Sequence, residues 1–234
     1  SRVYSIPPLA DLSVEAIDGA YRPVVDSNLP IGLTATGVSE GFSTTAPVSL
    51  YGATKLASEA LALEYGETFN LPVFINRCGV LAGAGQFGRP DQGIFAYWIN
   101  SWKQQRPLKY IGFDGQGHQV RDCLHPRDLL PLLQKQFTAG SLPVDHRIIN
   151  CAGGLKSSRS LRQLSTWCAD RYGPQEVASE ATPRPFDIPW MVLDSAKAQN
   201  IWNWEPQTRT EDILTEIADH ADQNRSEERR VGKE

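Results

Sequence analysis

Apolar and polar positions follow their most regular pattern over residues 49–70. Apolar side chains recur there at mostly three- and four-residue spacings, and many of them are alanine. This spacing aligns them along one face of a helix, so the sequence predicts a helix that begins at Ser49 and ends near Asn70. Residues 71–77 form an apolar run of strand length, and the several glycines of residues 78–93 predict a loop. A helix, a buried strand and a glycine-rich loop in this order indicate an α/β fold.

The same alternation continues along the chain. The pattern predicts helices over residues 93–105, 126–137, 161–172, 195–204 and 211–221, and strands or extended segments over 108–113, 118–125 and 146–152. Capping side chains are expected at Ser158 or Ser160, at Asp194 and at Thr210. Prolines at positions 183, 185 and 189 predict an extended segment that crosses between elements. Trp98 and Trp102, one helical turn apart, are expected in the core or in an interface stripe.

Composition narrows the class of protein. Hydrophobic residues make up 41% and charged residues 21% of the 234 positions, which is typical of a folded globular chain. The net charge of −4 and the lack of a basic stretch before the last residues argue against nucleic acid or a membrane surface as a partner. No apolar run reaches the roughly 18 residues of a membrane span, and the first residues do not resemble a secretory signal. We expect a cytoplasmic protein.

The four cysteines are far apart in the sequence and form no C-x-x-C motif. This spacing favours neither a metal site nor a disulfide framework, so reduced thiols and no bound metal are expected.

Tyr51 and Lys55 are the candidate chemical groups of the predicted helix at 49–70. Their four-residue spacing places both side chains on the same side, one turn apart. A nearby ammonium favours the phenolate form of a tyrosine, which can then exchange a proton with a substrate hydroxyl. The alternative is structural: Lys55 extends past the apolar stripe while Tyr51 caps the start of the helix.

Five sequence motifs surround this pair in a recognisable order. They are "VYS", "YGATKLASE", "VFINRCGVLAG", "QVRDCLHPRDLL" and "RPFDIPWMVLDSAKAQNIWNWEPQTRTEDIL". In this order the chain resembles the extended short-chain dehydrogenase/reductases, namely the NAD-dependent nucleotide-sugar epimerases and dehydratases, over nearly all of residues 1–220. Residues 77–93 and 106–125 resemble most the CDP-paratose 2-epimerase branch of that family.

The resemblance implies an α/β fold that comprises the C-terminal part of a Rossmann-type parallel sheet and a smaller α/β substrate-binding lobe. Residues 1–80 would form a partial NAD-binding domain, and residues 81–220 mainly the substrate-binding lobe, with elements that return to the Rossmann domain. Residues 221–234 are charge-dense and are expected to be a disordered or extraneous tail. The family's glycine-rich dinucleotide motif is not found in the sequence. The position of its catalytic serine or threonine would immediately precede Ser1. We therefore expect an N-terminally truncated fragment that is inactive alone.

The resemblance also implies roles for single residues. Tyr51 matches the catalytic tyrosine, and Lys55 matches the lysine that binds the nicotinamide ribose. The backbone at Cys78 and Gly79 would meet the nicotinamide amide of NAD. The side chains implied to contact the nucleotide sugar are Gln86, Asp91, Gln92, Arg121 and Arg184, of which the two arginines would hold the diphosphate. His125 is interpreted as a helix-entry histidine bonded to backbone, with acid–base catalysis as the alternative.

The predicted function is that of an NAD-dependent nucleotide-sugar epimerase, an isomerase that oxidises a sugar carbon and returns the hydride to the other face. A nucleotide diphosphate sugar is the expected ligand and a homodimer the expected assembly. One alternative is a 4-epimerase or 4,6-dehydratase acting on UDP-, dTDP- or GDP-sugars. Ser1 and Arg2 stand where dehydratases of the family place Asp-Glu, which argues against dehydration. The other alternative is a nucleotide-sugar binding module without catalysis.

Overall fold

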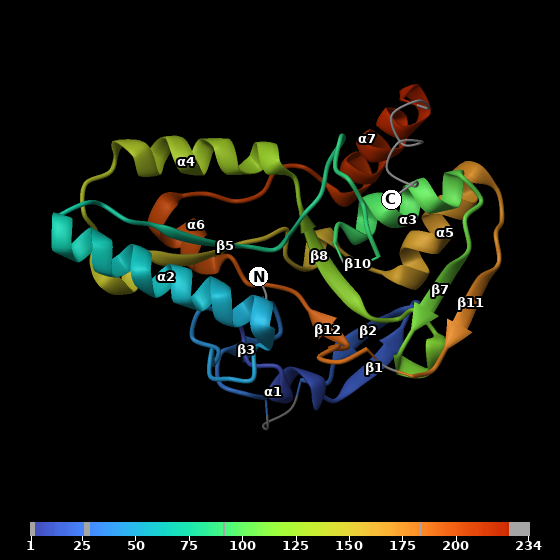
Figure 1. The fold of residues 1–234 in the computed structure, drawn as a ribbon, viewed down its shortest axis with the longest axis horizontal. Helices are drawn as coiled ribbons and strands as arrows, with labels where there is room; N and C mark the ends of the chain where they lie inside the picture. The colour runs from blue at the N-terminus through green and yellow to red at the C-terminus, as the bar shows by residue number, and fades with distance from the viewer. Residues whose placement is uncertain (1–2, 26–28, 91, 183, 225–234) are drawn as a thin grey trace.

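The computed structural model describes residues 3–25, 29–90, 92–182 and 184–224. Helices and short strands alternate along them (Figure 1). The helices are α1 (Pro7–Ala10), α2 (Ser49–Phe69), α3 (Ile94–Lys103), α4 (Leu129–Thr138), α5 (Leu161–Tyr172), α6 (Ala196–Trp202) and α7 (Thr210–Gln223). The strands are β1 (Val14–Ile17), β2 (Ala20–Pro23), β3 (Leu33–Thr34), β4 (Gly37–Val38), β5 (Ile75–Cys78), β6 (Val80–Leu81), β7 (Leu108–Ile111), β8 (Val120–Leu124), β9 (Ile148–Cys151), β10 (Ser158–Ser160), β11 (Val177–Glu180) and β12 (Trp190–Met191).

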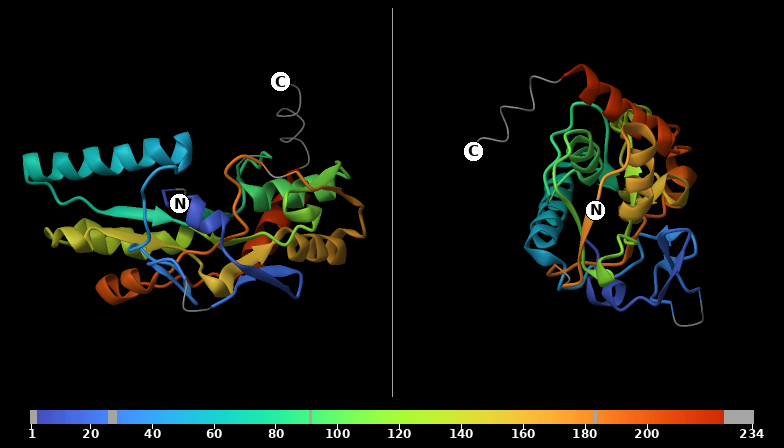
Figure 2. Two further views of the ribbon diagram at one scale, coloured as in Figure 1. Left: turned by 90° about the horizontal axis from the view of Figure 1, so that it is seen from below. Right: turned by 90° about the vertical axis from the view of Figure 1, so that its right-hand side faces the viewer.

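Two parallel strands, β5 and β9, run through one end of the molecule. Helix α2 lies on one side of this pair, and α4 and α6 lie on the other (Figures 1 and 2). The space between the strands and α4 and α6 is filled by a buried cluster that includes Leu132, Ile149, Ala198 and Trp202. Parallel strands covered by helices on both sides are typical of a Rossmann-type sheet.

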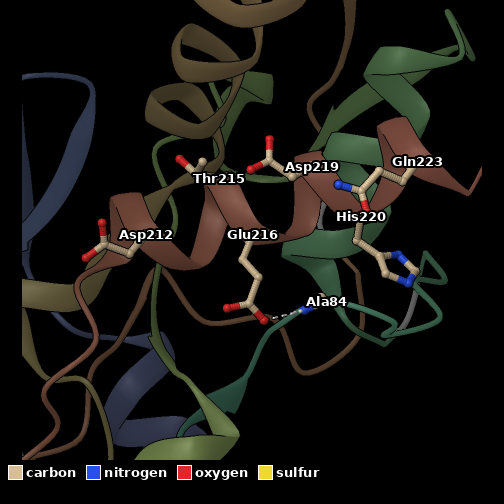
Figure 3. Close-up of a pocket in the computed structure, with 7 residues that line it drawn as sticks. All are labelled: Ala84, Asp212, Thr215, Glu216, Asp219, His220 and Gln223. Atoms are coloured by element: carbon tan, nitrogen blue, oxygen red, sulfur yellow. Dashed lines mark hydrogen bonds between the residues drawn. The ribbon is translucent and has the colours of Figure 1, made fainter.

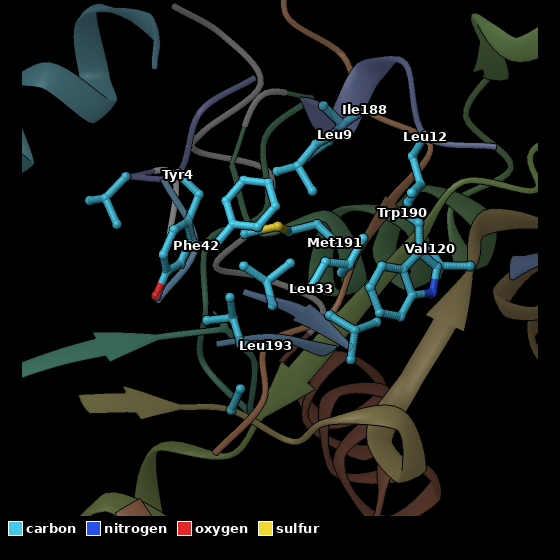
Figure 4. Close-up of a cluster of buried hydrophobic side chains, with 14 of the residues drawn as sticks. Tyr4, Leu9, Leu12, Leu33, Phe42, Val120, Ile188, Trp190, Met191 and Leu193 are labelled. Atoms are coloured by element: carbon cyan, nitrogen blue, oxygen red, sulfur yellow. The ribbon is translucent and has the colours of Figure 1, made fainter. Parts of the chain in front are cut away.

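Strand β8 organises the middle of the molecule. It pairs antiparallel with β10 and parallel with β12 and β6. Beyond it, β7 and β11 form a parallel pair. Helices α3, α5 and α7 pack together over a core that includes Phe95, Trp98, Leu164 and Leu214. A third cluster joins the N-terminal segments to β8 and β12 through Tyr4, Leu9, Leu33, Trp190 and Leu193 (Figure 4).

The predicted helices are confirmed with small changes at their ends. Helix α2 ends at Phe69, and Asn70 follows in the left-handed conformation that closes a helix. Ser160 caps α5 in a reciprocal capping box with Gln163, which decides between the two predicted serines. Trp98 and Trp102 are both 2% exposed, so they belong to the core.

Four sequence predictions were wrong in detail. The strand begins at Ile75 rather than at residue 71, and β6 occupies part of the predicted loop at 78–93. Thr210 is the first residue of α7 rather than its cap, and Arg209 at the cap position makes no side-chain capping bond. Asp194 does accept a hydrogen bond from the Ala196 backbone at 2.7 Å, but it lies one position before the cap of α6.

The ends of the chain are described only in part. Tyr4 is buried although it is not part of a strand, because its ring packs against Phe42 and its hydroxyl donates to Asn150. The predicted tail at 221–234 begins too early, because α7 continues to Gln223 and Ala221 is buried. From residue 225 onward the predicted tail lies outside the described residues. Among the described helices, none combines the length and the apolar character needed to cross a membrane.

Candidate active site

Tyr51 and Lys55 lie in the first two turns of α2. Both side chains are exposed, and Tyr51 keeps 60% of its accessible surface. The Lys55 ammonium lies over the Tyr51 ring, with Nζ 5.4 Å from the ring centre. The predicted arrangement on one side of the helix is therefore present, and both side chains can reach a ligand bound beside the start of α2.

A buried ion pair holds α2 against the sheet. Glu59 on α2 accepts from the Arg77 guanidinium on β5 at 2.7 Å, and both side chains are largely buried. Arg77 also donates to the Tyr4 hydroxyl at 3.4 Å. Burial raises the pKa of Tyr4, so this phenol remains protonated and donates to Asn150 Oδ1 at 2.6 Å. The network fixes the helix that carries the candidate pair relative to β5 and β9.

Cys78 and Gly79 lie at the end of β5, where the backbone passes over a buried carboxyl group. Burial raises the pKa of the Cys78 thiol. A Cβ on Gly79 would lie 2.7 Å from Asp122 Oδ1, so a larger residue would force this backbone away. Asp122 is 2% exposed and accepts from the Leu193 backbone at 3.0 Å, and burial raises its pKa. Sequence analysis missed Asp122, although an aspartate inside an apolar strand is itself a signal.

The glycine-rich segment at 79–93 carries the predicted sugar contacts. Gln86 donates to the Leu81 carbonyl at 2.8 Å, while its Oε1 is buried without a partner among the described residues. Gln92 is exposed, and its backbone pairs with that of Arg89. Asp91 lies outside the described residues. Gln86 therefore turns into its own loop, whereas Gln92 faces solvent.

Arg121 contacts the segment that crosses toward β12, and Arg184 is part of that segment. Arg121, on β8, donates to Asp187 Oδ1 at 3.2 Å and to the Ile188 carbonyl at 3.0 Å. Arg184 is exposed and donates to the Pro90 carbonyl at 3.1 Å, which joins the crossing segment to the glycine-rich loop. In this structure the charge of Arg121 is balanced by Asp187, so diphosphate binding there would exchange one anionic partner for another.

His125 is hydrogen-bonded to the backbone at the entry to a helical turn, as the sequence predicts. Its Nδ1 accepts from the Arg127 backbone at 3.1 Å, and its Nε2 lies 3.1 Å from Glu216 Oε1 on α7. The histidine is buried at the entry to a 3₁₀ turn, Pro126–Asp128, that leads into α4.

Two surface hollows lie apart from the Tyr51–Lys55 pair. One, of about 430 Å³, is lined by Ala84 and by α7 residues that include Asp212, Glu216, Asp219 and His220 (Figure 3). The other, of about 460 Å³, lies between α4 and the end of α6. Neither hollow is lined by the candidate pair, so the assignment rests on side-chain chemistry rather than on cavity shape. The described residues contain no cluster of three or more His, Cys, Asp or Glu side chains that could hold a metal ion.

A model of the NAD dependent epimerase/dehydratase family matches residues 32–152, just over half of the chain. The chain belongs to this family. The match to the epimerase/dehydratase family includes Tyr51, Lys55 and Arg121, whereas Arg184 lies beyond it.

Similar family members differ in the substrates that their names give. The chain is 29% identical to UDP-glucuronate 4-epimerase of Thermodesulfobacterium geofontis, over 76% of this chain and 52% of the relative. It is 28% identical to CDP-paratose 2-epimerase of Salmonella typhi, over 73% and 51% respectively. The chain thus spans about half the length of the curated relatives it matches.

Solved structures of the family share the fold. UDP-glucuronic acid 4-epimerase from Bacillus cereus, in complex with UDP-glucuronic acid and NAD, matches with a TM-score of 0.68 at 24% identity, over 83% of this chain and 60% of that one. UDP-glucose 4-epimerase from Thermus thermophilus, in complex with NAD, matches with a TM-score of 0.64 at 21% identity, over 94% and 63% respectively. These matches confirm the predicted Rossmann-type α/β fold.

Proposed function

We propose that the protein to which this chain belongs is an NAD-dependent nucleotide-sugar epimerase in which Tyr51 transfers the proton and Lys55 binds the cofactor. The observation that carries the proposal is the paired exposure of the two side chains on α2, with Nζ of Lys55 5.4 Å from the Tyr51 ring centre. A lysine that only covered apolar surface would not require a tyrosine ring beneath its ammonium group.

The residues present fit one end of NAD. The Lys55 ammonium offers three hydrogen-bond donors toward solvent, which suits the two hydroxyls of the nicotinamide ribose. Gly79 allows the backbone after β5 to run close over Asp122, and its N–H donates to the Cys151 carbonyl at 2.8 Å. The nicotinamide amide would meet the remaining peptide groups of Cys78 and Gly79. The glycine-rich motif that binds the cofactor diphosphate is not found in the sequence. Our assignment of NAD-binding residues therefore covers only the nicotinamide end.

Bound NAD would supply the reversible hydride acceptor. The Tyr51 oxygen would take the proton of the sugar hydroxyl while that carbon is oxidised to a ketone. The same phenol would return the proton after the ketone has presented its other face. Epimerisation therefore needs no separate acid and base, and Lys55 would hold the ribose.

For the substrate we propose a CDP-sugar epimerised at C2, as in CDP-paratose 2-epimerase. This proposal is supported by the resemblance of residues 77–93 and 106–125 to that branch. A UDP-sugar 4-epimerase is the second candidate, because the relative named UDP-glucuronate 4-epimerase is as similar to the chain as the CDP-paratose enzyme. In either case Arg121 and Arg184 would bind the diphosphate, with Gln86 and Gln92 beside the sugar.

We also propose the division into domains that the resemblance implies. Residues 1–80 would contribute to the NAD-binding domain and residues 81–220 mainly to the sugar-binding lobe. A homodimer is part of the same proposal.

Exchange of Tyr51 for phenylalanine tests the assignment in the full protein. We expect Tyr51→Phe to lower kcat by roughly 10² to 10⁴, the usual contribution of a general acid–base, with little change in substrate affinity. Proton NMR would follow turnover of CDP-paratose, UDP-glucuronate and UDP-glucose. Tyr65→Phe is the matched control, because Tyr65 is on the same helix and is similarly exposed. An unchanged kcat in Tyr51→Phe would refute the assignment, and turnover of the UDP-sugars alone would select the second candidate.

Titration of the 234-residue chain with NADH addresses the part of the site that is present. Saturable change in nicotinamide fluorescence, lost in Lys55→Met, would support binding by the α2 pair. If the folded chain does not bind NADH, cofactor binding requires residues of the protein outside this chain. In that case the chain would at most bind its nucleotide sugar.

A further inference from the structure

A carboxylate of the C-terminal helix α7 contacts the glycine-rich loop. Glu216 projects from α7 toward Ala84 (Figure 3), and its Oε1 accepts from the Ala84 backbone at 3.4 Å. The same oxygen lies 3.1 Å from His125 Nε2, and Oε2 accepts from the Arg127 guanidinium at 2.5 Å. One side chain thus joins α7 to the loop and to the end of β8.

The hydrogen bond between Glu216 and His125 has a fixed donor and acceptor. Because Nδ1 of His125 accepts from the Arg127 backbone, the neutral ring carries its proton on Nε2 and donates to Glu216. The His125 side chain is 8% exposed and the Glu216 side chain 32% exposed, so this bond is largely shielded from water. Together these contacts lower the pKa of Glu216 despite its partial burial, so it is a carboxylate at neutral pH.

The loop is packed closely around this bond. A Cβ on Gly83 would lie 3.1 Å from His125 Nε2, so the loop backbone passes directly over the imidazole. A Cβ on Gly88 would lie 2.1 Å from the Tyr97 backbone nitrogen on α3, which leaves no room for any side chain. Gln86, a predicted sugar contact, lies between these two attachments.

We propose that Glu216 is a positioning residue for the nucleotide sugar. Through Ala84 and His125 it fixes residues 83–88 of the loop, and thereby the backbone that carries Gln86. Glu216 lines the hollow between Ala84 and α7, and it would affect the sugar only through the position of the loop. This inference rests on the proposed function, because it takes the loop to cover the sugar.

Variants of Glu216 test the idea in the full protein. Glu216→Ala removes both acceptors, and loss of one charge-assisted hydrogen bond corresponds to about a tenfold effect. We expect hydrogen exchange at the amides of residues 83–88 to become about tenfold faster. We expect KM for the nucleotide sugar to rise by a similar factor, with kcat changed by less than about twofold. Glu216→Gln keeps an acceptor oxygen for Ala84 and His125 and should restore most of both properties.

Two control variants separate loop positioning from general stability. Asp219→Ala removes a carboxylate from the same hollow, where Asp219 pairs with Arg171 and not with the loop. Arg127→Ala removes the ion pair and leaves the bonds to Ala84 and His125. Neither should change loop exchange or KM. If Glu216→Ala fails to fold, Ala84→Pro gives the contrast instead, because it removes the N–H that donates to Glu216 and should cause the same faster exchange at the remaining loop amides and the same rise in KM.

The inference is overturned if Glu216→Ala leaves exchange at 83–88 unchanged. It is also overturned if exchange accelerates while KM stays the same, since the loop would then be anchored without serving the sugar. Failure of the proposed function would instead appear as an active Tyr51→Phe, and the exchange measurement does not depend on that result.

Discussion

Helices α2 and α7 differ in how they are attached to the rest of the molecule. Helix α2 has 21 residues, and its buried positions are two glycines, Gly52 and Gly66. Helix α7 has 14 residues and buries six, including Ile213, Leu214 and Ile217. Both sequences contain apolar residues at helical spacing. Helix α7 buries several of them in the core, whereas on α2 Leu56 packs against a core cluster and is only partly buried.

The difference shows that an amphipathic pattern predicts a helix more firmly than it predicts what the helix packs against. Glycines let α2 approach its neighbours closely, as where a Cβ on Gly66 would lie 2.8 Å from Val73 Cγ2. The opposite side leaves Leu61 and Tyr65 more than 60% exposed. Exposed apolar side chains gathered on one helix are typical of a surface that another chain or segment covers. With few buried contacts, α2 should also open more easily than α7.

The largest effect is expected from breaking the ion pair that attaches α2. Glu59→Ala leaves the Arg77 guanidinium buried without its anionic partner, which should lower the free energy of unfolding by about 3 to 5 kcal/mol. Urea unfolding followed by circular dichroism would measure it. Glu67→Ala is the control on the same helix, because Glu67 is 59% exposed and its pair with Arg147 should contribute about 1 kcal/mol or less. Equal effects of the two variants would show that α2 is not held by the buried pair.

The second largest effect on the free energy of unfolding is expected for a core leucine of α7. Leu214 is fully buried, so Leu214→Ala removes apolar burial and leaves a cavity, at a cost of about 2 to 5 kcal/mol. The same urea titration measures the change. A loss below about 1 kcal/mol would mean that the core around α7 can collapse into the space left behind.

The smallest effect is expected for the same substitution on α2. Leu61 is 63% exposed, so Leu61→Ala should change the unfolding free energy by about 0.5 kcal/mol or less. A loss comparable with that of Leu214→Ala would show that Leu61 is covered in solution. Sedimentation of the wild-type chain would then test whether a second copy covers it.

Much of the fold could be predicted because it depends on local pattern. The helix at 49–70, the cap at Ser160 and the strand at β9 were each indicated by spacing, capping chemistry or an apolar run. The strand at 71–77 was placed too early because apolar character alone does not say where hydrogen bonding begins. In the structure pairing with β9 starts at Ile75, opposite Ile148.

The candidate site was predicted only in part, for a related reason. Tyr51 and Lys55 are neighbours along one helix, so their spacing already determines their relative direction. Asp122 and Glu216 act across long sequence separations: Asp122 accepts from Leu193, and Glu216 contacts Ala84 and His125. No local pattern encodes such contacts.

The sequence by itself determined the order of elements and the pair on α2, because each depends on a local pattern of residues. It also determined the membership of the epimerase/dehydratase family, because the family's motifs are local patterns that follow one another in a fixed order along the chain. Only the tertiary structure decided which apolar faces are buried, that Arg121 is balanced by Asp187, and that the glycine-rich loop rests on a carboxylate of α7. Those features depend on how distant segments approach one another in space, and burial and charge pairing are set by that approach.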